Sequence, residues 1–99
     1  MRRGSTPVNR FEQPLTKDKV QALSVTYVQD GAVVLKKKLN DVEVQDYKVV
    51  VNLDQEDTLK FDDTKQVKIQ VKIKDIFNKM HISNVMYKTV GEVLDEDVM

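Results

Sequence analysis

The clearest signal in the chain is a regular alternation of hydrophobic and polar residues within short segments. In the segment 67–74, Val67, Ile69, Val71 and Ile73 alternate with lysine and glutamine. When the pattern repeats every two residues, one side of the segment faces a core and the other side faces water. This indicates a half-buried antiparallel strand. The same reasoning predicts further strands over 8–13, 23–28, 32–36, 42–44, 47–53 and 85–94.

Turn-forming residues separate these segments. Asp30-Gly31 lies between two β-rich runs and predicts a two-residue type I′ hairpin, which needs positive φ at both positions. Asp54 is expected to cap one helical turn, and Pro14 is expected to end the first strand because it has no backbone N–H. Gly91 is expected to mark a bulge in the last strand. Other turns are predicted at 15–19, 39–41, 46, 62–64 and 75–80.

Seven to eight short strands spaced roughly 8–12 residues apart predict an all-β fold, either an antiparallel two-sheet sandwich or a small barrel. The bias toward β-branched residues agrees, with 17 Val and 4 Ile against 7 Leu and 2 Ala. The helical turn between two strands is typical of immunoglobulin-like sandwiches, although the Cys and Trp of antibody domains are absent. We therefore predict one immunoglobulin-like β-sandwich domain over 8–99, preceded by a flexible arm over 1–7.

Charge and composition narrow the classes of partner. The 16 basic and 16 acidic residues cancel, which disfavours nucleic acid and anionic membranes as partners and leaves little repulsion against self-association. The charges are uneven, because the chain starts with Arg2 and Arg3 and its end carries Glu92, Asp95, Glu96 and Asp97. With no Cys, no apolar run near the ~18 residues of a membrane span and no signal-like start, an intracellular place of synthesis is expected.

No residue set predicts catalysis, a cofactor or a metal site. The single histidine, His81, has Ser83 two residues away, but no nucleophile elbow or Gly-rich oxyanion loop accompanies the pair. Carboxylates are frequent, but their positions suit turn capping and solubility better than a cleft with paired acids or an EF-hand. They are Asp54, Glu56, Asp57, Asp62 and Asp63.

The candidate partner contacts are basic. Lys68, Lys72 and Lys74 form a stripe on one strand, with Lys65 nearby, and Arg2 and Arg3 lie in the predicted arm. A single-strand nucleic-acid binder would combine such lysines with exposed aromatic rings, whereas most aromatic residues here fall on the core side of their strands. A wet strand face that discourages aggregation is the simpler interpretation of this stripe and of 36–38. Val34 and Val50 fall on positions of the alternating pattern that face outward. This predicts either strands that are covered on that side or an exposed apolar patch for a protein partner.

Several segments resemble small prophage proteins of Gram-positive bacteria. The chain begins with MRRGSTP, which resembles their MRRGTTP opening, and continues with ALSVTYVQDGAVVLKK, which resembles their strand–hairpin–strand with its Tyr-x-Gln-x-Gly pattern. Later come LDQEDTLKF, similar to their LTQEDT-x-x-F turn, and VKIQVKIK and ISNVM, which resemble their last two strands. The chain departs from them at NRFEQPLTKDK, where those proteins are more apolar.

The resemblance implies an immunoglobulin-like sandwich that serves as an accessory protein of a phage tail or baseplate, synthesised in the cytoplasm of a bacterial host and associated with the virion. Our leading hypothesis is therefore a non-enzymatic phage or prophage structural or assembly protein that acts by protein–protein contact or self-association. One alternative is an OB-like module that binds single-stranded nucleic acid through the lysine stripe. Another is a host-surface or carbohydrate-binding module, which would need exposed aromatic residues, and the chain has no Trp.

Overall fold

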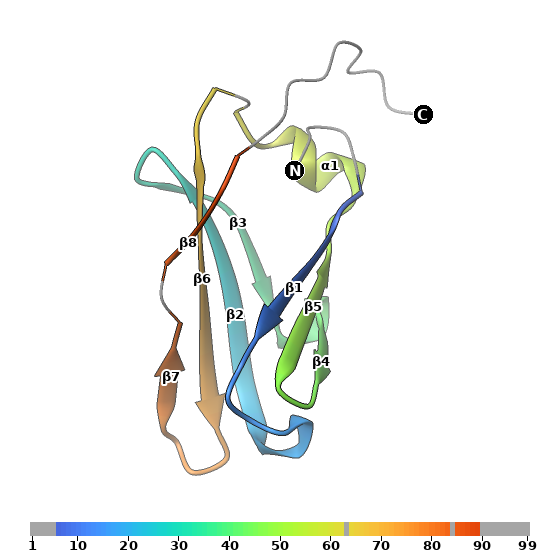
Figure 1. Ribbon diagram of the computed structural model, residues 1–99, viewed down its shortest axis with the longest axis vertical. Helices are drawn as coiled ribbons and strands as arrows, with labels where there is room; N and C mark the ends of the chain where they lie inside the picture. Colours follow the sequence, from blue (N-terminus) through green and yellow to red (C-terminus); the bar gives the residue numbers. More distant parts are fainter. Residues whose placement is uncertain (1–5, 63, 84, 90–99) are drawn as a thin grey trace.

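The chain folds into two antiparallel β-sheets that pack face to face (Figure 1). The computed structural model describes residues 6–62, 64–83 and 85–89, and within these ranges it contains eight strands. This confirms the predicted all-β, two-sheet sandwich. The predicted arm over 1–7 lies largely outside the described residues, so its boundary with the domain over 8–99 stays a prediction.

The smaller sheet has three strands in the order β1-β5-β4, with bounds Val8–Glu12, Lys48–Asn52 and Glu43–Gln45. The larger sheet has the order β3-β2-β6-β7, and β8 also pairs with β6. Its strands are β2 Val20–Gln29, β3 Ala32–Lys38, β6 Val67–Asp75, β7 Met80–Ile82 and β8 Met86–Lys88. Strand β1 is thus one edge of the smaller sheet, and β7 with β8 forms one edge of the larger sheet.

Short helical turns make the connections between strands. The 3-10 turn η1 (Lys17–Lys19) follows Pro14, the 3-10 turn η2 (Leu39–Asp41) links the two sheets, and α1 (Gln55–Leu59) follows β5. The α1 turn is held by reciprocal hydrogen bonds: the Asp57 N–H donates to Asp54 Oδ1 at 2.7 Å, and the Asp54 N–H donates to Asp57 Oδ2 at 3.2 Å. The predicted cap at Asp54 is confirmed.

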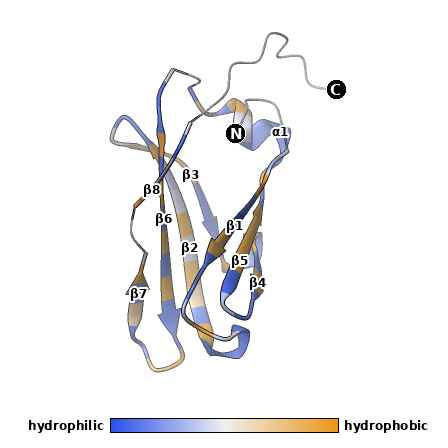
Figure 2. Ribbon diagram, viewed as in Figure 1, coloured by the Kyte–Doolittle hydropathy of each residue, from blue (hydrophilic) through white to orange (hydrophobic). Residues whose placement is uncertain are grey.

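The core lies between the two sheets and comes from the predicted alternation. Figure 2 shows hydrophobic and hydrophilic positions alternating along β6, whose inward residues are buried. The Tyr27 ring packs against Phe61 with centroids 5.8 Å apart. Other core side chains are Phe11, Leu23, Val25, Leu35, Val49, Val51, Leu53, Val67, Ile69, Val71 and Ile73.

The β2–β3 hairpin has the predicted turn. Asp30 has φ 52° and Gly31 has φ 77°, the pair of positive values that a type I′ turn requires. Short-range sequence chemistry determines this turn, because Gly and Asp tolerate the left-handed region better than most residues.

One prediction about a face was wrong. The alternation in 47–53 puts Tyr47 on the same face as Val49 and so predicts a core position, but Tyr47 occupies the β4–β5 turn with φ 61° and its side chain is exposed. Its backbone N–H donates to the Leu15 carbonyl at 2.8 Å, so the turn is tied to the segment after Pro14. Of the two alternatives for Val34 and Val50, covered strands are confirmed, because Val50 is buried and Val34 packs against the core.

Of the last predicted strand, 85–94, the described residues contain β8 at Met86–Lys88, and 90–94 lie outside them. The predicted bulge at Gly91 lies outside the described residues. The first strand ends at Glu12, next to the predicted end at Gln13, and its pairing places Phe11 opposite Val49. Phe61 points into the core as predicted, whereas Leu59 is half-buried.

Candidate interaction surfaces

His81 and Ser83 both make hydrogen bonds at the edge of the larger sheet. The His81 Nε2 lies 3.0 Å from Asp75 Oδ2. Asp75 Oδ1 also accepts the N–H groups of Phe77 at 2.8 Å and Lys79 at 3.0 Å, so this buried carboxylate organises the β6–β7 turn. The hydrogen bond from His81 and those backbone donors hold the pKa of Asp75 below its ordinary value.

The Ser83 hydroxyl accepts the N–H of Val71 at 2.9 Å, and the Ser83 N–H donates to the Val71 carbonyl at 2.9 Å. These bonds continue the ladder of β6 where the edge strand is interrupted between β7 and β8. Through these hydrogen bonds Ser83 supports the edge of the sheet.

The acidic residues act mainly as caps and ion-pair partners. Asp57 lies 3.0 Å from Lys37 Nζ, which ties α1 to β3. Burial works to raise the pKa of Asp57, but the hydrogen bonds from Lys37 and from the Asp54 N–H outweigh it and lower that pKa. Asp62 accepts from the N–H and hydroxyl of Thr64. Across 6–62, 64–83 and 85–89, no cluster of three or more His, Asp or Glu has the geometry of a metal site.

The predicted lysine stripe lies on the outer face of the larger sheet. Lys68 and Lys72 are exposed and Lys74 is half-buried. Lys36 and Lys38 from β3 share this face, because β3 pairs with the other side of β2. Two neighbouring residues are used elsewhere: Lys37 points inward to Asp57, and Lys65 pairs with Asp30 at 2.9 Å. Arg2 and Arg3 are outside the described residues.

Half of the aromatic residues are exposed, contrary to the expectation that most belong to the core. Phe11, Tyr27 and Phe61 are buried, but Tyr47, Phe77 and Tyr87 are exposed. Tyr87 lies directly opposite Lys68 across the β6–β8 pair, so an aromatic ring stands beside one lysine of the stripe.

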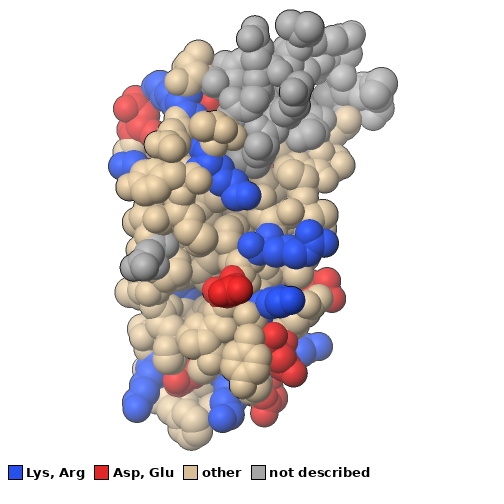
Figure 3. Space-filling view, viewed as in Figure 1, with Lys and Arg blue, Asp and Glu red and all other residues tan. Residues whose placement is uncertain are grey.

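The sequence analysis missed an exposed apolar edge. Six large apolar side chains between positions 76 and 87 are 43–68% exposed, on the β6–β7 turn, β7 and β8: Ile76, Phe77, Met80, Ile82, Val85 and Tyr87. We call them the apolar edge. Figure 3 shows that much of the surface over β7 and β8 is free of charged side chains. A signal existed in Met80-His81-Ile82, where the large apolar residues Met80 and Ile82 alternate with His81 and face outward.

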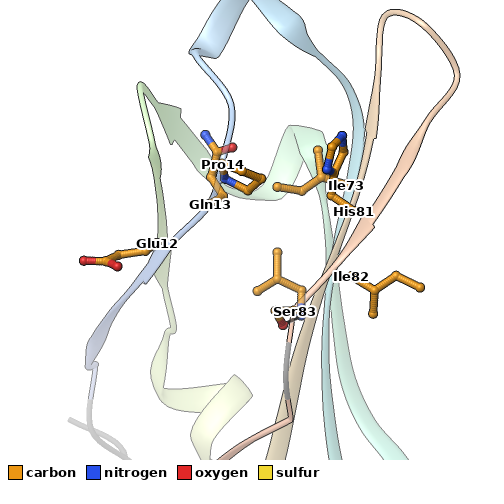
Figure 4. Close-up of a pocket in the computed structure, with 8 residues that line it drawn as sticks. Glu12, Gln13, Pro14, Ile73, His81, Ile82 and Ser83 are labelled. Atoms are coloured by element: carbon orange, nitrogen blue, oxygen red, sulfur yellow. Dashed lines mark hydrogen bonds between the residues drawn. The ribbon is translucent and has the colours of Figure 1, made fainter.

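A cavity of about 270 Å³ opens between this edge and β1, lined partly by core residues of β6, Val71 and Ile73. In Figure 4, Pro14 and Ile73 point toward each other across it, while Glu12 and Ile82 point away on opposite sides. The two sheets therefore separate here, at the side where both present an edge strand.

Comparisons with known proteins give no identification. No protein-family model, no curated protein and no solved structure matches the chain. Among the described residues, no helix is both long enough and apolar enough to cross a membrane. The fold and surfaces thus define a two-sheet β-sandwich with an apolar edge and a lysine-rich outer face.

Proposed function

We propose that this protein is a non-enzymatic structural or assembly protein that associates with further copies of itself through the apolar edge. The observation that carries the proposal is the concentration of exposed apolar side chains along β7 and β8 and in the turn before β7. Contiguous apolar surface of this kind is typical of a protein-binding site. The resemblance to prophage proteins supports a place in a phage tail or baseplate, and association with the virion belongs to the same proposal.

The strand arrangement explains how such contact would form. Within the described part of the chain, β7 and β8 pair only with β6, so their other sides carry unpaired backbone donors and acceptors. A strand from a second copy can add to this side, with backbone hydrogen bonds giving affinity and alternate side chains giving specificity. A two-fold arrangement would pair the same edge on both copies.

Charge balance favours a second copy as the occupant. The chain has a formal net charge of zero, so two copies meet with little overall repulsion. The strands of the apolar edge are short, at three residues each, but their outward positions carry apolar side chains and no proline. Its residues Met80 and Ile82 point outward, where a second copy would cover them.

Light scattering coupled to size exclusion, at several protein concentrations, tests the proposal. We expect a discrete closed oligomer for the natural chain and a shift toward monomer for Ile82→Lys, which places a charge on the apolar edge. Val33→Lys is the matched control, because Val33 is a similar side chain, 62% exposed against 58% for Ile82, on the far strand β3. A monomer at every concentration, or equal effects of the two variants, would refute self-association through this edge.

A second candidate function, binding of single-stranded nucleic acid, is favoured by Tyr87 standing opposite Lys68 on the lysine face. A base can stack on an exposed ring while lysines contact the phosphates. Fluorescence anisotropy with a labelled oligonucleotide should then show binding that weakens steeply with salt. Tyr87→Ala should weaken it further, and no binding at low ionic strength would rule this function out.

A further inference from the structure

The outer face of the larger sheet contains a groove between two rows of lysines. Its floor is the small outward side chains of β2, and its walls come from the strands on either side. Strand pairing sets Ser24 between Lys38 and Lys72, Thr26 beside Lys36, and Ala22 beside Lys74. We call this the lysine groove, formed by Ala22, Ser24, Thr26, Val28, Lys36, Lys38, Lys68, Lys72 and Lys74.

The groove is hollowed and has the width of an extended chain. Shallow hollows of about 320 Å³ and about 200 Å³ lie along it, the first lined by lysines of both walls and the second by Lys68 and Lys72. Because neighbouring strands are ~4.8 Å apart, the walls on β3 and β6 stand ~10 Å apart. A polypeptide in extended conformation fits that width.

The charge of the groove is uncompensated within the part of the chain that the structure describes. No ion pair there involves Lys36, Lys38, Lys68, Lys72 or Lys74. The outward residues of β2 and β6 between the walls are small or polar and include no carboxylate. Five like charges on one face favour an anionic ligand, which would relieve their mutual repulsion.

We propose that the acidic segment 90–99 of the same chain docks in the lysine groove. This segment carries Glu92, Asp95, Glu96 and Asp97 and no basic residue, so its charge complements the groove. It follows β8, which pairs with the Val67 end of β6, two strands away from β2. The mouth of the groove at Val28 is therefore ~10 Å from Tyr87, which lies opposite Lys68 and three residues before the segment.

The spacing of the acids matches the spacing of the lysines. Glu92 follows Tyr87, the residue opposite Lys68 at the mouth, by five positions in the chain. Three to five further residues extend ~10–17 Å, which is the distance along β6 from Lys68 to the level of Lys72. Asp95, Glu96 and Asp97 would then lie among the lysines at positions 36, 38 and 72.

The same chain is favoured over a second copy because the covalent link keeps the segment close. A short linker gives an effective concentration in the millimolar range, well above that of a free partner. A docked segment would also shield the groove from external polyanions. The groove borders the apolar edge, because Met80 and Val85 line its two hollows and Tyr87 lies opposite Lys68. Docking of the segment within one chain does not require self-association through that edge.

Zero-length cross-linking with a carbodiimide, applied to the full chain, tests the proposal because it joins only carboxylates and amines that are in contact. Trypsin releases the tail as a single peptide from Thr89 onward, since no Lys or Arg follows Lys88. We expect this peptide joined to lysines 36, 38, 68 or 72, with yields that fall at high salt as screening weakens the contact. Equal joining to Lys17, Lys48 and Lys60, which lie outside the groove, would overturn the proposal.

An equal mixture of unlabelled and ¹⁵N-labelled protein distinguishes one chain from two. We expect each cross-linked product to be wholly light or wholly heavy. Mixed products would overturn docking within one chain, and they would show that the segment reaches a second copy.

A second readout avoids chemical modification. The variant E92Q/D95N/E96Q/D97N should move the backbone amide resonances of Ser24 and Thr26, on the groove floor, in two-dimensional NMR spectra. The matched control K48Q/K60Q removes two exposed charges elsewhere and should leave those resonances unchanged. Unchanged groove resonances in the acid variant would overturn the proposal.

Discussion

A buried hydrogen bond joins the two sheets, and its removal provides the sharpest test of the packing. The Asn9 Nδ2 donates to the Tyr27 hydroxyl at 3.0 Å, and both residues are almost fully buried. Asn9 belongs to β1, one wall of the cavity between the sheets, so this bond fixes the inward side of that edge strand. We choose Tyr27→Phe as the perturbation, because it removes the hydroxyl and keeps the ring against Phe61.

The expected loss of stability comes from the Asn9 amide, which Tyr27→Phe leaves without its partner. The Asn9 amide loses its acceptor while it stays in the core, and an unpaired buried polar group costs about 1–3 kcal/mol. For a domain of this size, about 1 kcal/mol shifts the melting temperature by about 4–8 °C. Adding Asn9→Leu removes the orphaned amide as well, so the double variant should recover most of that loss.

Urea unfolding followed by circular dichroism measures these free energies if the transition is two-state. Tyr87→Phe is the control, because its hydroxyl is exposed, and a change within about 0.5 kcal/mol is expected there. The reasoning would be refuted by a loss below about 0.5 kcal/mol for Tyr27→Phe, or by a double variant that is no more stable than the sum of its single changes predicts.

Four further outcomes are expected. Burial raises the pKa of Tyr27 to about 12, so the unfolded chain ionises first and about 2 kcal/mol of stability should be lost as the pH rises from 10 to 12, measurable by alkaline unfolding. Lys37→Met should cost about 2 kcal/mol in urea unfolding, because Asp57 loses its cation in a largely buried position, and Asp57→Asn should restore part of it. Gly31→Ala should cost about 1 kcal/mol by the same assay, since φ is 77° and no neighbour crowds the site. The protection factors against hydrogen exchange of the two turn amides that donate to Asp75 should fall as the pH drops below the ordinary carboxyl range, because the lowered pKa of Asp75 marks stabilisation that protonation removes.

Much of the fold was predictable because its signals are local. The alternation in 67–74 identified β6 and its buried face, since a strand turns successive side chains to opposite sides. Asp30-Gly31 identified the hairpin, and Asp54 identified the cap of α1, since both depend on the conformational preferences of one or two residues. The same local preferences could not place Tyr47, because a backbone bond to the distant Leu15 holds its turn.

The candidate surfaces were only partly predictable. Lys68, Lys72 and Lys74 were recognisable as one wet face, because they share a single strand. That Lys36 and Lys38 lie on the same face could not be predicted, because it depends on β2 pairing with β3 on one side and with β6 on the other. The apolar edge was missed for a related reason. A large apolar residue is expected in the core unless the order of strands shows that its own strand lies at the edge of the sheet.

The sequence by itself thus determined the strands, the hairpin, the helical cap, the class of fold and the lack of a recognisable catalytic set, since each depends on neighbouring residues or on composition. Tertiary structure decided which strands became edges, how Val50 was buried, that Asn9 reached Tyr27, and that lysines about 30 positions apart came to flank one groove. The physical reason is that pairing between distant strands depends on the packing of the whole core, and no local pattern specifies it.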